Sequence, residues 1–334
     1  SFHCACEAVQ ASSAPTACDI PISRKSAASL GSSNWAASPG WNAATIAIPS
    51  AEVPKATSEK PDQLGLAVSL WQTFVAVNWP ADVQKYRGVP ADPTNTEKYK
   101  DLRGPRVWET WKQNWETSGD LSDWNSYEAD LREVPCRYVV DKQGTMTKVT
   151  KENWPSLYKD VGGGTVLANF NTLKPKVLGS KAPDGVPFDE TGPLLDANND
   201  YVAFEIRFNK ELYDCVKDGA GDGCARSSDA ITLPAADTQR HGAITLKASW
   251  RKVSPDMVQS MFYVRDMLVL GFEKVAGAKA KYSPVCRVES RALVGTHIVF
   301  KDKYIAAGLS KANQWFWASF EQTSNSVLCN PLPG

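Results

Sequence analysis

The feature that most constrains the fold of this 334-residue chain is a two-residue hydrophobic period in its second half. Apolar and polar residues alternate through five segments, which are residues 201–209, 243–250, 261–272, 287–300 and 314–322. Successive side chains of a strand point to opposite faces, so each segment presents one apolar and one polar face. The pattern predicts antiparallel sheets with one face on the core and the other in water.

Residues 61–160 carry helical signals instead. An apolar stripe at helical spacing, followed by Pro80, predicts a helix over residues 64–79. Three tryptophans at helical spacing predict a second helix between Gly104 and Gly119. Residues 136–152 alternate about a turn at 142–144 and predict an edge hairpin.

The first 60 residues differ from both of these regions. Ala and Ser supply 22 of the first 50 residues, and no helical or strand period persists. We expect an irregular arm over residues 1–60, a helical and mixed segment over 61–160, and a β-sandwich over 161–334. The expected fold is mostly β with a helical layer (α+β), an antiparallel β-sandwich of jelly-roll type that forms one compact domain.

Eight dispersed cysteines indicate an oxidising compartment. Their number is even and no Cys-x-x-Cys pair occurs, so we expect disulfides and a secreted, periplasmic or extracellular protein. Cys215 and Cys224 bracket a Gly/Asp-rich loop and are predicted to pair. Cys286 and Cys329 lie near the ends of a strand-rich segment. We expect a disulfide between them that connects those two ends. The rival interpretation of residues 3–6 is a metal site, although two thiolates and one His are an incomplete ligand set.

Charge and motifs exclude several classes of protein. Lys plus Arg and Asp plus Glu each number 37, so the formal net charge is zero. Nucleic-acid binding needs an electropositive face, so we expect no nucleic-acid partner. No stretch approaches the roughly 20 apolar residues that span a bilayer. The chain has no P-loop, no Gly-x-Ser-x-Gly elbow and no His-Glu-x-x-His motif, and no cofactor is expected.

The densest candidate for a binding site is the segment 314–322. In a strand, Trp315, Trp317, Ser319 and Glu321 point one way, while the intervening apolar residues point to the core. Pyranose rings stack on indoles, and hydroxyl and carboxylate groups orient sugar hydroxyls. This pattern predicts a glycan site. The alternative is that both tryptophans cover the sheet beneath a helix or the arm.

Further site residues lie on the polar faces of two other segments. Glu205 and Arg207 occupy the polar face of residues 201–209 and are predicted to bind the same ligand. If residues 287–297 form one regular strand, Glu289, Arg291 and His297 share a face with Arg287. If the protein is an enzyme, the catalytic candidates are a His base and its charged neighbours, namely His297, Glu321, Arg291 and Glu289. A ladder of cross-strand ion pairs beside a partly buried His is the alternative.

A calcium site is one interpretation of residues 196–200. Asp196, Asn198 and Asp200 offer alternating oxygen ligands. The segment lacks the Gly and Glu of an EF-hand loop, because Tyr201 and Arg207 occupy those positions. Ordinary Asx turns explain it better.

Three functions remain after these exclusions. The first is a secreted glycan-binding β-sandwich that uses exposed tryptophans. The second is a self-assembling extracellular subunit of a filament or surface layer. The irregular arm and the zero net charge favour this function. The third is a lyase or hydrolase that degrades polysaccharide. Exposed tryptophans near His297 or Glu321 would favour the first function, whereas tryptophans covered by the arm of another copy would favour the second.

Overall fold

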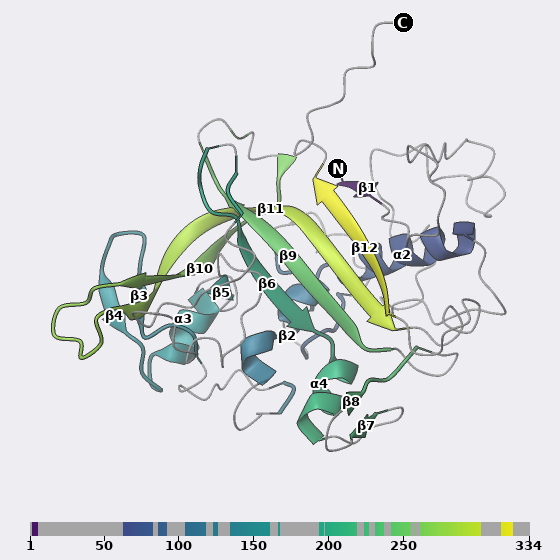
Figure 1. Cartoon of the computed structure of the whole chain (residues 1–334), viewed down its shortest axis with the longest axis horizontal. Helices are drawn as coiled ribbons and strands as arrows, with labels where there is room; N and C mark the ends of the chain where they lie inside the picture. Colours follow the sequence, from purple (N-terminus) through teal and green to yellow (C-terminus); the bar gives the residue numbers. More distant parts are fainter. Residues whose placement is uncertain are drawn as a thin grey trace, which may run out of the picture.

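The computed structural model describes one large sheet and the elements packed on it (Figure 1). The predicted arm lies outside the described residues, apart from a short strand at its start. The described residues are 2–5, 63–82, 86–91, 104–117, 123–125, 134–160, 166–167, 194–196, 198–218, 224–226, 231–236, 242–254, 257, 261–301 and 315–322.

Strands dominate the described residues. The strands are β1 (Phe2–Ala5), β2 (Lys112–Gln113), β3 (Tyr138–Val140), β4 (Met146–Lys148), β5 (Val166–Leu167), β6 (Ala203–Phe208), β7 (Ala225–Arg226), β8 (Ile231–Thr232), β9 (Ile244–Lys252), β10 (Val264–Glu273), β11 (Ser283–Lys301) and β12 (Trp315–Gln322). The α-helices are α2 (Gln63–Val77), α3 (Trp154–Asp160) and α4 (Lys210–Asp218), and two 3₁₀ turns are η3 (Val107–Thr110) and η4 (Asn114–Thr117). The five alternating segments are therefore confirmed as strands, and the first predicted helix is confirmed as α2.

Ten of these strands form a single sheet. Six of them follow the order β1-β12-β11-β9-β6-β2, and β10, β3, β4 and β5 branch from this path, with β4 paired to β3. The 19-residue β11 is its central strand, because its first half also pairs with β10 and β3. All the long strands pair antiparallel, whereas β3 and β5 join the sheet in parallel. The sheet curls into an open half-barrel (Figure 1). The predicted jelly-roll sandwich is not confirmed, because among the described residues only β7 and β8 lie outside this one sheet.

Two hydrophobic cores cover opposite sides of the sheet. Helix α2 packs on the side we call the inner face, where Phe74 stacks on Phe320 with ring centroids 4.1 Å apart. Met267 and Leu268 are neighbours in β10 and therefore point to opposite faces. Met267 enters the first core, while Leu268 enters a second core that α3 covers with Trp154. We call the opposite side of the sheet the outer face. The second core and α3 cover this face at β10.

The second predicted helix is wrong, because residues 107–117 form two 3₁₀ turns around β2. The two turns repeat one local pattern, Trp-Glu-Thr, at a spacing of seven residues. Glu109 Oε2 accepts the backbone N–H of Arg106 at 2.7 Å, and Glu116 Oε2 accepts that of Gln113 at 2.7 Å. The hydroxyls of Thr110 and Thr117 each donate to the carbonyl three residues back. These local bonds satisfy the ends of each turn and leave residues 112–113 extended to pair with β6.

A one-residue bulge interrupts β11 where it crosses β9. Leu293 pairs with Trp250 and Gly295 pairs with Ser249, so Val294 is the extra residue. A one-residue shift moves every later side chain to the other face of a sheet. Odd-numbered residues of β11 consequently point to the inner face before the bulge and to the outer face after it.

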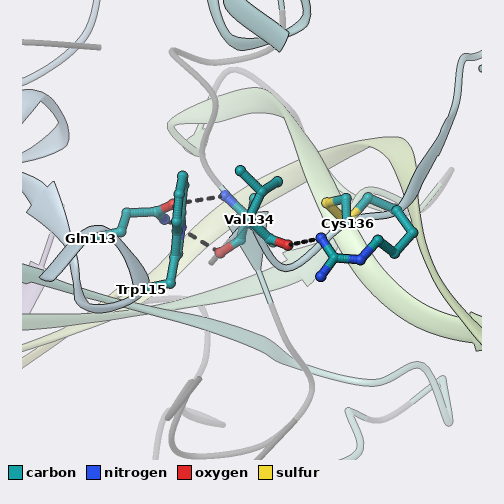
Figure 2. The surroundings of a disulfide bond; sticks show 7 residues. Gln113, Trp115, Val134 and Cys136 are labelled. Atoms are coloured by element: carbon teal, nitrogen blue, oxygen red, sulfur yellow. Dashed lines mark hydrogen bonds between the residues drawn. A yellow bond between two sulfur atoms is a disulfide. The ribbon is translucent and has the colours of Figure 1, made fainter. Parts of the chain in front are cut away.

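Two disulfides lie within the described residues. The predicted bond between Cys215 and Cys224 is present and joins α4 to the residue before β7. The prediction for Cys286 is wrong, because it pairs with Cys136, 150 residues away, and not with Cys329, which lies outside the described residues. The parallel contact of β3 with β11 brings the two sulfurs together beside Trp115 (Figure 2). This long-range pairing has no signal in cysteine spacing.

Removing the two disulfides separately tests this arrangement. In the chain-entropy model, replacing Cys136 and Cys286 by Ala opens a 150-residue loop and costs about 5 kcal/mol of unfolding free energy. Replacing Cys215 and Cys224 by Ala opens a loop of nine residues and costs about 2.5 kcal/mol. Urea denaturation of both variants measures the difference. Equal losses would contradict the assignment of the long-range bond.

Candidate functional site

The candidate site lies on the outer face, where β6, β9, β11 and β12 run side by side (Figure 1). The strand register places its side chains in three rows across these four strands. In the order β6, β9, β11, β12, the rows are Phe208, Thr245, Val299 and Trp317; Ile206, Lys247, His297 and Ser319; and Phe204, Ser249, Gly295 and Glu321.

Strand β12 has the orientation that its alternation predicts. Ala318 and Phe320 are buried in the first core, while Trp317 is 44% exposed and Glu321 is exposed. Trp315 lies two residues before Trp317 and is only half-buried. Among the described tryptophans, Trp317 alone is classed as exposed, so its indole is the one presented to solvent.

His297 links the central row to β12. Its Nδ1 lies 2.7 Å from Ser319 Oγ, within hydrogen-bonding distance, and the two residues are direct cross-strand partners. On its other side, His297 is paired in register with Lys247 of β9. The Lys247 Nζ lies 4.6 Å from the ring centroid of Phe204, a cation–π contact that holds the amine over an apolar floor. The row therefore combines a cation, an imidazole and a hydroxyl.

The predicted catalytic group is divided by the bulge at Val294. Because the side chains change faces there, Arg287, Glu289 and Arg291 lie on the inner side of β11, opposite to His297. The prediction that these residues share a face with His297 is therefore wrong. A bulge inside an alternating run of residues leaves no reliable mark in the sequence.

The charges before the bulge form ion pairs of their own. Arg291 Nη2 donates to Glu289 Oε2 at 2.6 Å, and Arg291 Nη1 donates to the carbonyl of Tyr201 at 2.8 Å. Arg287 makes two bonds of 2.7 Å to the carboxylate of Glu273. Only the Arg287–Glu273 pair crosses from β11 to β10, so the cross-strand ion pairs of the alternative interpretation are found in part.

Glu205 and Arg207 do not lie on a surface, so their predicted role as ligand-binding residues is wrong. Glu205 is 1% and Arg207 0% exposed, because the polar face of β6 is the inner one. Arg207 Nε donates to Glu205 Oε2 at 2.7 Å, and Trp250 Nε1 donates to Glu205 Oε1 at 2.9 Å. Arg207 Nη1 donates to the carbonyl of Trp111, and Gln113 donates to Glu205. Burial raises the pKa of the Glu205 carboxyl, and Arg207 opposes that rise.

The loop proposed for calcium is an Asx turn. Asp196 Oδ1 accepts the backbone N–H groups of Asn198 and Asp200 at 2.8 and 3.0 Å. Its Oδ2 pairs with Arg251 Nε at 3.0 Å. Partial burial raises the pKa of Asp196, but the bonds from Arg251 and the backbone outweigh this effect and hold the pKa below its ordinary value. Both carboxylate oxygens are thus engaged by protein donors.

Sequence reasoning missed Lys247 and the aromatic floor beneath it. Lys247 belongs to the polar stripe of residues 243–250, so the sequence already placed it on a shared face with Thr245 and Ser249. Only the register of β9 against β11 sets it beside His297. Phe204 lies on the apolar stripe of β6, which the alternation pattern assigned to the core and the structure assigns to the outer face.

Comparison of the chain with protein-family models, curated proteins and solved structures finds no match. None of the described helices is long and apolar enough to cross a membrane. Within the same described ranges, no group of three or more His, Cys, Asp or Glu is placed to hold a metal ion.

The buried pair of β6 yields a stability prediction. Arg207→Met leaves the Glu205 carboxylate buried without its cation, which costs about 3–5 kcal/mol of unfolding free energy. The double variant Glu205→Leu/Arg207→Met removes both charges, and we expect it to be more stable than Arg207→Met. Arg287→Met, which breaks a solvent-exposed pair with Glu273, costs less than about 1 kcal/mol. Denaturant titration of the three variants checks this order, and equal losses for Arg207→Met and Arg287→Met would contradict it.

Lys112 yields a prediction of pH dependence. Burial lowers the pKa of this lysine to about 8, although Glu116 nearby opposes the effect. Between about pH 8 and the ordinary value of 10.5, the unfolded chain binds the proton that the native protein has released. The stability of the wild type relative to Lys112→Met should therefore rise with pH across this window, by roughly 2–3 kcal/mol. Chemical denaturation at several pH values measures it, and a difference independent of pH would refute the burial of a charged amine.

Proposed function

We propose that the chain is a secreted glycan-binding protein whose ligand lies on the outer face of the curled sheet. The observation that carries the proposal is the exposed indole of Trp317 beside the hydrogen-bonded pair Ser319 and His297, with the exposed Glu321 two residues further along β12. A pyranose ring has an apolar face and a rim of hydroxyls. The outer face offers a stacking surface and polar groups at the spacing of one sugar.

The physical argument rests on the distances within β12. Alternate residues of a strand are about 7 Å apart, so a ring stacked on Trp317 reaches Ser319 with its hydroxyls, and a second ring reaches Glu321. Hydroxyl, imidazole and carboxylate groups donate and accept hydrogen bonds with sugar hydroxyls, while the indole removes apolar area from water. The two disulfides support an oxidising, extracellular location as part of the same proposal.

Trp317→Ala tests the stacking surface. We expect at least a tenfold loss of affinity for whichever glycan the wild type retains on an array, because the ring loses its only exposed aromatic platform on β12. Tyr86→Ala is the matched control, because Tyr86 is an exposed aromatic residue outside the outer face, and it should bind as the wild type does. Isothermal titration with the array hit measures both variants. An array without hits, or unchanged affinity in Trp317→Ala, would refute the proposal.

Self-association is the second candidate, and the edge of β12, as far as the described strands show it, favours this function. β1 pairs with β12 only along Ser319–Gln322. No other described strand pairs with this edge beside Trp315–Ala318. Unpaired strand edges are templates for strand addition from another chain. Sedimentation that shows large particles, together with an empty glycan array, would favour this function over glycan binding.

The enzyme alternative keeps only part of its candidate group. Glu289 and Arg291, two of the four catalytic candidates, lie on the other side of the sheet from His297. His297 and Glu321 remain on the outer face, where both fit a binding surface.

A further inference from the structure

We infer that the glycan carries an anionic substituent, a carboxylate or a sulfate, and that Lys247 binds it. The inference rests on the proposed function and names the ligand class of the same surface. The observation behind it is the central row of the outer face, in which Lys247, His297 and Ser319 follow one another across β9, β11 and β12.

The position of the amine is defined by its surroundings. Lys247 Nζ lies 4.6 Å from the centroid of Phe204, which is buried, and Ile206 is its direct partner on β6. An ammonium held over an apolar floor interacts more strongly with an anion than one in bulk water, because the local dielectric is lower. A charge-assisted hydrogen bond is about twice as strong as a neutral one. This amine is therefore suited to bind a carboxylate or sulfate oxygen.

The distances fit a ligand that extends across the strands from β12 to β9. Neighbouring strands are about 4.8 Å apart, so β9 lies about 10 Å from β12 on the same face. A ring stacked on Trp317 directs its substituents over His297 toward Lys247. The imidazole and the Ser319 hydroxyl, already hydrogen-bonded to each other, lie beneath the bridging part of the ligand.

An acidic group of this face, Glu321, lies at the other end of the surface. Glu321 is in the neighbouring row, on β12, two strands away from Lys247. Opposite charges at the two ends of the surface orient a ligand that has an anion at one end and hydroxyls at the other. The arrangement disfavours the reverse orientation, in which the anion would face Glu321.

A pair of ligands that differ only in charge tests the inference. Polygalacturonate and its fully methyl-esterified form share one backbone, and dextran sulfate and dextran form a second pair. Wild type should bind the anionic member of at least one pair tenfold or more tightly than its neutral counterpart, and added salt should reduce this preference. Trp317→Ala should lose affinity for both members.

Lys247→Gln is the decisive variant. It should remove the preference for the anionic ligand and leave affinity for the neutral one within about twofold, since stacking on Trp317 persists. Lys252→Gln is the matched control, because Lys252 lies on the same strand but on the inner side, and it should keep the preference. Equal binding of charged and neutral ligands by wild type would overturn this inference alone. Absence of binding to these ligands and to every other array glycan would overturn the proposed function with it.

Discussion

The bulge at Val294 is the constraint on which the two faces of this molecule depend. It lies in β11, the strand that pairs with β9, β10 and β12, so a one-residue shift there is transmitted to the whole sheet. Before the bulge, Leu293 packs inward against the same core as Trp250. After it, His297 points outward between Lys247 and Ser319. Without the extra residue, either the core or the outer face would lose its side chains to the opposite side.

The inner face accommodates the charges of Glu205 and Arg207 because both side chains have hydrogen-bond partners. Glu205 receives hydrogen bonds from Arg207, Trp250 and Gln113, and Arg207 also reaches the carbonyl of Trp111. The two Trp-Glu-Thr turns supply part of this network, since β2 lies between them and brings its carbonyl and amide groups against β6. A buried ion pair of this kind contributes less to stability than to specifying one arrangement, because a strand slipped by one residue would leave both charges unpaired.

The outer face has the opposite character. Trp317 is exposed there, and the polar groups lie in rows that cross four strands, so no single stretch of sequence contains the surface. The glycan proposal and the assembly alternative both use β12, the former through its side chains and the latter through its backbone edge. This shared strand means that a ligand on Trp317 and a neighbouring chain on the edge would influence each other.

What the sequence alone determined was local. The alternation of residues 243–250 and 314–322, the stripe that forms α2, the hairpin of β3 and β4, and the loop closed by Cys215 and Cys224 all depend on neighbours in the chain. The tertiary structure decided what depends on register and on distant partners. Burial of Glu205 and Arg207 required Trp111 and Trp250 as donors and acceptors, the Cys136–Cys286 bond required the parallel contact of β3 with β11, and the separation of Arg291 from His297 required a bulge. A hydrophobic period defines two faces for each strand, but only pairing and packing choose which of them is buried.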